Sequence, residues 1–314
     1  PLYILLVLTR SLYGVLGSAG PPAAQAYIAD RTERHERTAG LSGFSAAFGL
    51  GAMLGPGFGA ATALLGKTAP FFSIAAVALL MSIVVFAYLP ERTGPKERKP
   101  GARVRILDPR IRPFMIFGLT FGVANAIPIQ TIGFYFMDVL GYSAARAPQF
   151  VSIGLTGGAG AALFAQLVIV QRYRVDPKWL MRVSPLLIVA GHTLIWTAPS
   201  LWPVVAGLTI AGFGAGLAVP GYSAASSLAV NASEQGAAMG LAGSAGAAGF
   251  IIAPLIAATL YGVAPQAPYV LTSLVAAGLF VFALASRAVG AATNARKPEA
   301  APEPCDDPAS APYQ

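Results

Sequence analysis

Charged residues are scarce in this sequence. Asp, Glu, Lys and Arg make up 11% of the 314 residues, whereas a soluble domain carries about 25%. No residue of these four types occurs from Val183 to Val230, or from Gln235 to Ser286. Because a membrane-spanning helix needs about 20 apolar residues, each of these stretches is long enough for two spans. The sequence therefore predicts an all-α membrane protein.

Cysteine and histidine are also rare, since the chain has only Cys305, His35 and His192. A single cysteine excludes an intrachain disulfide. No spacing typical of a metal site, a catalytic nucleophile or a phosphate-binding loop is present, so a membrane-embedded enzyme is the weaker interpretation. We expect no catalytic residues, no cofactor and no metal. A lone histidine inside a span, such as His192, is more often a bonded interior residue than a functional one.

The formal charge of +8 would by itself suit a nucleic-acid-binding protein. The basic residues, however, lie in short loops between the apolar stretches, so we expect no nucleic-acid partner. One side of the predicted membrane carries 18 of the Lys and Arg residues and the other side carries two, Lys67 and Arg146. By the positive-inside rule, the richer side is cytoplasmic and holds the C-terminus. We expect a bacterial-type cytoplasmic (inner) membrane.

The apolar stretches divide into nine predicted transmembrane helices. These cover roughly residues 2–29, 39–65, 69–89, 113–138, 148–171, 180–198, 203–230, 236–261 and 267–287. Four regions follow: a partial N-terminal helical half of three spans (1–89), a basic cytoplasmic inter-half loop (90–112), a C-terminal six-helix half (113–289) and a disordered cytoplasmic tail (290–314). Three further spans in front would give twelve, with both ends cytoplasmic.

An internal repeat supports the division into halves. A shift of 198 residues superposes Gly14 on Gly212, Pro22 on Pro220, Gly51 on Gly249 and Pro56 on Pro254. The same shift places the first predicted span on the seventh and the second on the eighth, with both copies running in the same direction. Parallel repeats of six spans are the arrangement of major facilitator transporters.

The second predicted span has glycines at every fourth position, at Gly51, Gly55 and Gly59. They share one helix face, which favours close approach of another helix. The segment Gly51-x-x-x-Gly55-Pro56-x-x-Gly59 resembles the fifth-helix motif of the drug/proton antiporters of the major facilitator superfamily, in the tetracycline and multidrug efflux-like branch. That motif usually ends in two glycines, and Ala60 takes the last position here.

Other segments carry the same resemblance over almost the whole chain to residue 288. The segment from Val7 to Gly14 is similar to the fourth-helix motif with its buried arginine, although Leu16 stands where a glycine is common. The end of the fourth predicted span, from Phe134 to Gly141, resembles the end of the seventh helix. The resemblance makes the nine predicted spans helices 4–12 of twelve and places the first three helices upstream. The second copy of a cytoplasmic motif, expected near 166–182, lacks its glycines here.

Arg10 is the strongest single candidate for a functional residue, because a charge about two turns inside a span is energetically costly unless it is paired. The alternative is that Arg10 extends to the outer surface. The resemblance links this arginine to proton coupling, and Tyr27–Asp30 followed by Arg37 resembles the loop between helices four and five. Candidate coupling or conformational residues are Arg10, Asp30, Arg37, Gly51, Gly55, Pro56 and Gly59.

Substrate is expected near the bilayer midplane between the halves. The polar candidates inside spans are Gln25, Tyr27, Asn125, Gln130 and Tyr222. Each residue also has a plainer interpretation as a partner in an interhelical hydrogen bond. The fourth predicted span is favoured, because Pro128 breaks its helix between Asn125 and Gln130.

The leading hypothesis is a monomeric secondary transporter that exports drugs or other small amphiphilic molecules by alternating access. Its partners would be the small-molecule substrate, protons and the lipid bilayer. The alternatives are a major facilitator importer or facilitator of a small metabolite, and a truncated membrane protein that does not transport.

Overall fold

The computed structural model describes residues 2–17, 20, 24, 27, 47, 50–51, 54–66, 68–89, 104–173, 175–231 and 234–293. Within these ranges all regular structure is helical, and no strand occurs. Seven helices in this part of the chain are long and apolar enough to cross a membrane. The prediction of an all-α membrane fold is therefore confirmed.

The N-terminal part contributes α1 (Leu2–Gly17) and α4 (Ala69–Tyr88). Residues 54–63 are also helical and belong to the second predicted span. The first two predicted spans are thus described only in part. Helix α4 matches the third predicted span to within a residue.

Six spans follow the segment that precedes α5, each within about three residues of its predicted bounds. They are α5 (Arg112–Asp138), α6 (Ala147–Phe164) continued by η1 (Ala165–Val170) and α7 (Gln171–Tyr173), α8 (Pro177–Trp196), α9 (Leu201–Leu228), α10 (Gln235–Val263) and α11 (Ala267–Ala285). A short helix, α12 (Arg287–Gly290), ends the described chain. The stretch η1 is π-helical and widens the backbone of a single continuous span.

Proline marks where several of these helices begin. It occupies one of the first two positions of α4, α5, α6, α8 and α11. At that point the missing N–H has no intrahelical role, and the fixed φ of proline suits the helix. Further prolines lie inside α5, α8, α9 and α10, at Pro128, Pro185, Pro220 and Pro254. Each of these removes one backbone donor, which neighbouring helices make tolerable in a membrane.

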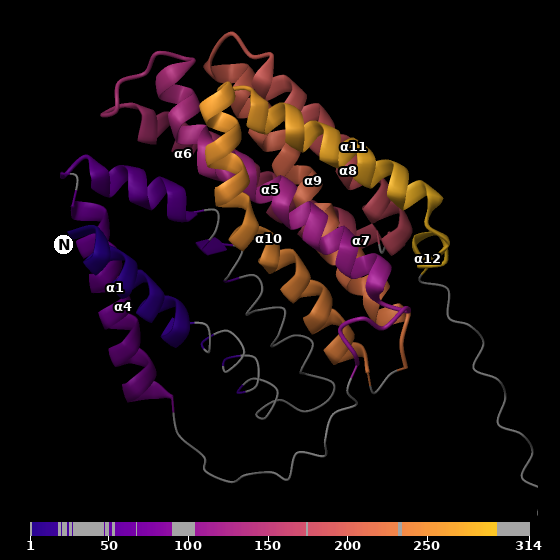
Figure 1. The fold of residues 1–314 in the computed structure, drawn as a ribbon. Coiled ribbons are helices and arrows are strands. Elements are labelled where there is room, and N and C mark those ends of the chain that lie inside the picture. Colours follow the sequence, from indigo (N-terminus) through magenta and orange to yellow (C-terminus); the bar gives the residue numbers. More distant parts are fainter. Residues whose placement is uncertain are drawn as a thin grey trace, which may run out of the picture.

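The helices from α5 onward form one bundle in which α9 contacts α5, α6, α8 and α10. Figure 1 shows α5, α8, α9, α10 and α11 running beside one another. Helix α5 packs mainly along α10 and also contacts α11. The largest buried cluster joins Phe114, Phe117 and Phe121 of α5 to Tyr222 of α9 and Leu279 of α11.

Glycine backbones set how closely these helices approach. A Cβ added at Gly122 of α5 would collide with the backbone of Gly246 in α10. A Cβ at Gly212 of α9 would collide with the backbone of Gly158 in α6. Because lipid is as apolar as the helix surfaces, van der Waals packing of this kind is a main source of helix association in membranes. The glycines therefore specify the helix pairs α5–α10 and α6–α9.

The outer surface of the described helices is apolar. On α4, no residue is buried, and Phe86 is 93% exposed. Leu255 and Ile251 of α10 and Leu274 of α11 are also largely exposed. Such a surface would be unfavourable in water, whereas in a bilayer it faces hydrocarbon. The lipid bilayer is therefore the natural solvent for this fold.

The packing at Gly122 yields a test with a matched control on the same helix. We expect Gly122→Ala to destabilise the protein by about 1–3 kcal/mol, because overpacking forces two backbones apart. Gly133→Ala should be neutral or slightly stabilising, since a Cβ at Gly133 would meet no described residue within 4 Å and alanine favours helix. Thermal unfolding of the detergent-purified variants measures both. Equal melting temperatures for the two variants would contradict the packing argument.

Candidate substrate pathway and coupling residues

Helix α5 separates two of the predicted substrate residues. Asn125 is half-buried, whereas Gln130 is exposed. Five residues of an α-helix turn through roughly 140° beyond a full turn, so the two side chains leave α5 on different faces. Pro128 between them is buried, and α5 continues through it, so the predicted break in the helix is wrong. The structure therefore does not bring Asn125 and Gln130 together, and each remains a separate prediction.

A cluster of hydroxyl groups lies just beyond Pro128. The Thr131 hydroxyl lies 3.2 Å from the Ile127 carbonyl oxygen and 3.2 Å from the Tyr269 hydroxyl of α11. Tyr135 donates a hydrogen bond of 3.0 Å to the carbonyl oxygen of Ile195 in α8. Its ring meets that of Tyr269 edge-on, with centroids 5.0 Å apart. These buried contacts tie α5, α8 and α11 together.

Tyr222 lies where three helices meet. It belongs to α9 and is only 4% exposed, and its ring centroid is 6.2 Å from those of Phe117 and Phe121. A Cβ at Gly118 of α5 would be 3.3 Å from the Tyr222 ring, and a Cβ at Gly246 of α10 would be 2.7 Å from its hydroxyl oxygen. Two glycines on neighbouring helices thus make room for this one side chain.

An ionic cluster joins the segment before α5 to the start of α10. Arg110 contacts Glu234 through both terminal nitrogens, at 2.9 and 3.1 Å, and lies 2.7 Å from Asp108. Glu234 also accepts a hydrogen bond of 3.2 Å from the backbone N–H of Asn231. We call Asp108, Arg110 and Glu234 the ionic clamp. Hydrogen bonds from Arg110 lower the pKa values of Asp108 and Glu234, and both carboxylates raise that of Arg110.

The ionic clamp is not among the sequence predictions, although the sequence carries one signal for it. Glu234 is the one charged residue between the two long uncharged stretches that end at Val230 and begin at Gln235. At the opposite ends of α5 and α10, Tyr261 donates a hydrogen bond of 2.9 Å to Asp138. Polar contacts therefore join α5 to α10 at both ends of their shared glycine interface.

Arg10 lies on the exposed surface of α1, with its guanidinium 5.4 Å from the centroid of the Tyr13 ring. Among the residues that the structure describes, no acidic side chain pairs with Arg10. It stands eight residues into α1, about 12 Å along the helix. Tyr27 is helical and half-buried. Gln25, Asp30 and Arg37 lie outside the described residues.

The predicted glycine motif differs from its repeat mate. A Cβ at Gly51, Gly55 or Gly59 would meet nothing within 4 Å among the described residues. At Gly57, beside the half-buried Pro56, a Cβ would lie 3.9 Å from the Thr156 hydroxyl of α6.

In the other copy of the repeat, the glycines are packed. The shift of 198 residues places Gly51 on Gly249, whose added Cβ would collide with Gly122 of α5. It likewise places Gly14, whose added Cβ would meet none of the described residues within 4 Å, on Gly212, which packs on Gly158. The close approach expected at the motif is thus seen in the C-terminal copy.

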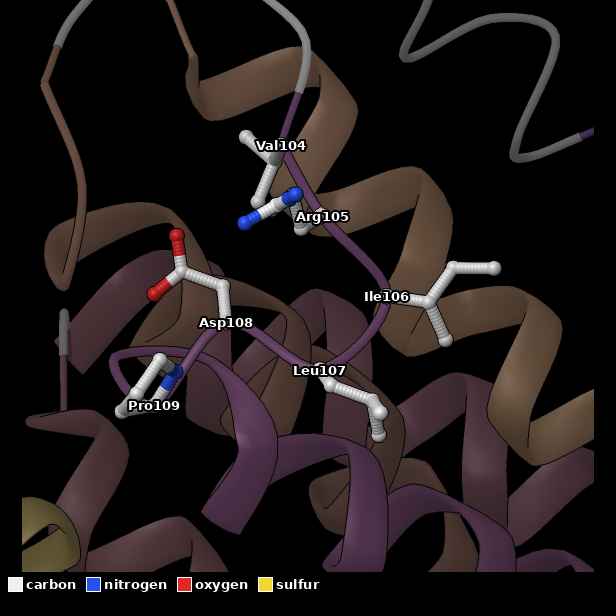
Figure 2. A pocket seen from close by; sticks show the side chains of 6 residues that line it. All are labelled: Val104, Arg105, Ile106, Leu107, Asp108 and Pro109. Atoms are coloured by element: carbon white, nitrogen blue, oxygen red, sulfur yellow. The ribbon is translucent and has the colours of Figure 1, made fainter.

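Figure 2 shows a pocket on the segment before α5, lined by residues 104–109. Its volume is about 720 Å³. None of the predicted substrate residues lines it. Within the described part of the chain, no group of three or more His, Cys, Asp or Glu side chains lies close enough to hold a metal ion.

The family model of the Major Facilitator Superfamily matches residues 1–175 and 162–309. The chain belongs to the Major Facilitator Superfamily. This membership confirms the interpretation of the chain as a membrane transporter rather than a membrane-embedded enzyme.

Curated relatives within the superfamily are resistance proteins. Multidrug resistance protein 1 of Bacillus subtilis (strain 168) is 28% identical over 279 residues, which cover 84% of this chain and 69% of that protein. Quinolone resistance protein NorA of Staphylococcus aureus is 26% identical over 284 residues, covering 85% and 69%. Multidrug resistance protein 2 of Bacillus subtilis is 37% identical over 90 residues, covering 29% and 22%. The resemblance to the multidrug efflux-like branch is therefore confirmed.

The ionic clamp predicts an acid-sensitive stability. Its carboxylates have lowered pKa values in the fold, so their contribution is complete above the ordinary values of 3.8 for Asp and 4.5 for Glu. It is lost as the pH falls through the lowered values. We expect Glu234→Gln to lower the melting temperature at neutral pH and to remove part of the loss that sets in as the pH falls below about 4.5. Thermal unfolding of the unchanged protein and of the Glu234→Gln variant is measured as a function of pH. If both lose the same amount of stability in acid, the clamp is excluded as the cause.

Tyr222 offers a second test of the packing. We expect Tyr222→Ala to cost about 3–5 kcal/mol of stability, because it leaves a cavity where three helices meet. Tyr222→Phe keeps the ring and should cost much less, since the hydroxyl makes no hydrogen bond with the described residues. Unfolding in mixed micelles measures the difference. Equal losses for both variants would show that the hydroxyl, and not the ring, holds this junction.

Proposed function

We propose that this transporter exports drugs or other small amphiphilic molecules in exchange for protons. The observation that carries the proposal is the match to two resistance proteins, each over more than four fifths of the chain. Their names connect them with multidrug and quinolone resistance. Aromatic side chains such as Tyr222, Phe117 and Phe121 suit contact with amphiphilic molecules of varied shape.

The helix contacts support alternating access. Helices α5 and α10 share the glycine interface at Gly122 and Gly246, and the ionic clamp and the Tyr261–Asp138 bond join their ends. Helices α6, α8 and α11 are tied to this pair through α9 and α5. A region packed in this way moves as one body. The six-helix half (113–289) would therefore rock against the N-terminal half (1–89), with substrate between them.

The orientation and the coupling residues belong to the same proposal. We propose that the basic ends of α5, α8 and α11 face the cytoplasm in a bacterial-type inner membrane, and the charge asymmetry of the sequence supports this orientation. Arg10 is proposed to couple proton and substrate binding. Asp30, Arg37 and the glycine motif would control the change of state, and Asn125, Gln130 and Tyr222 would contact substrate. The transporter is proposed to act as a monomer.

Proteoliposomes with an acidic lumen test the proposal on the purified full chain. We expect a fluorescent quinolone or lipophilic cation to accumulate in the lumen while a trapped pH dye reports proton loss. Coupling free energies between two sites are typically 1–3 kcal/mol, so Arg10→Gln should slow proton-driven accumulation about tenfold. Arg10→Lys is the matched control and should retain more activity. Substrate movement without a change in luminal pH would contradict proton exchange and indicate a facilitator.

A further inference from the structure

The segment before α5 presents two large apolar side chains to its surroundings. Ile106 is 65% exposed and Leu107 is 78% exposed. They lie in a turn in which the backbone N–H of Asp108 donates to the Arg105 carbonyl oxygen at 3.0 Å. Figure 2 shows both side chains pointing away from the Asp108 carboxylate. The turn therefore has an apolar side and a charged side.

The turn is fixed in place, so its apolar side chains cannot easily fold inward. Ile111, which follows it, is completely buried. Its backbone N–H donates to the Asp108 carbonyl oxygen at 3.1 Å. The ionic clamp attaches Arg110 to Glu234 at the start of α10. With anchors on both the core and α10, the exposure of Ile106 and Leu107 is a property of the folded state.

The charge around the apolar pair is positive. Within the clamp, the guanidinium of Arg110 forms ion pairs with the carboxylates of Asp108 and Glu234. Arg105 and Arg112 are exposed, and neither forms an ion pair with a described residue. Arg105 and Arg112 thus stand on either side of the apolar pair in the sequence, and within the described part of the chain no carboxylate forms an ion pair with them.

The position of the turn places it at the membrane boundary, because the span of α5 begins at Arg112. An apolar surface flanked by basic side chains is what binds at the interface of an anionic bilayer. Apolar side chains enter the acyl boundary, while guanidinium groups bind phosphate oxygens in bidentate fashion. The open pocket of about 720 Å³ along residues 104–109 leaves room for a lipid headgroup.

We propose that residues 104–112 form a docking surface for anionic phospholipid. Ile106 and Leu107 enter the acyl boundary, and Arg105 and Arg112 bind the lipid phosphates. The ionic clamp keeps this surface at the membrane boundary by fixing the turn to α10. This proposal does not depend on proton exchange or on the substrate.

The test places an environment-sensitive dye on the turn of the full chain. Cys305→Ser removes the single cysteine, and Leu107→Cys then carries the dye. The protein is reconstituted in vesicles that contain spin-labelled phosphatidylglycerol or spin-labelled phosphatidylcholine at equal density. We expect stronger quenching by the anionic lipid. Ser143→Cys, an exposed position beyond the other end of α5, is the matched control and should show no preference.

The arginines give the second arm of the test. Each basic residue near an anionic surface is worth about 1 kcal/mol, or about fivefold in binding. Arg105→Gln combined with Arg112→Gln should therefore remove most of the preference for phosphatidylglycerol, while the dye at position 107 still reports lipid contact. Size-exclusion chromatography confirms that the variants remain folded.

Three results would overturn the proposal. Equal quenching by both lipids would show that hydrocarbon alone is recognised. Absence of quenching by either lipid would show that protein or water covers Leu107. A preference that survives loss of both arginines would assign the recognition to other residues. None of these results bears on transport, so failure here is distinct from failure of proton exchange.

Discussion

Close contact between glycine backbones is the constraint on which the described bundle depends. In a bilayer, hydrocarbon surrounds both the separated and the associated helices, so burial of apolar surface contributes little to helix pairing. Side chains larger than hydrogen at Gly122, Gly212 or Gly249 would separate helices that now touch. The hydroxyl contacts of Thr131 and Tyr135 complement the glycines, because they join two other helix pairs, α5 to α11 and α5 to α8.

Charge acts at the ends of the helices, where the glycines do not. The ionic clamp lies outside the spans, whereas Tyr261 and Asp138 meet at the far ends of α5 and α10. This division follows from solvation, since unpaired charge is costly at the bilayer centre and tolerable near its surface. Helices α5 and α10 are therefore matched in the apolar region by shape and at their ends by polar pairs. Such a pair resists both sliding and rotation.

Much of the fold could be predicted from the sequence, because the signals for spans are local. Long uncharged and apolar stretches located the six spans of the six-helix region within a few residues. The partners of each helix could not be predicted, since Arg110 and Glu234 are 124 residues apart and no local pattern pairs them. For the candidate site, likewise, single residues could be predicted but their neighbours could not. Tyr222 was chosen as a polar residue within a span, yet its neighbours Gly118 and Gly246 come from two other helices.

The π-helical stretch η1 divides one span into two parts whose contact faces are set separately. Before it, α6 meets α9 through Gly154 and Gly158. Within it, Ala165 packs with Leu180 of α8 and Leu217 of α9. An α-helix turns about 100° per residue, and a wider turn changes that register for every later residue. The end of this span that follows η1 could therefore gain or lose a residue, or change its neighbours, while the glycine contact before η1 stays where it is.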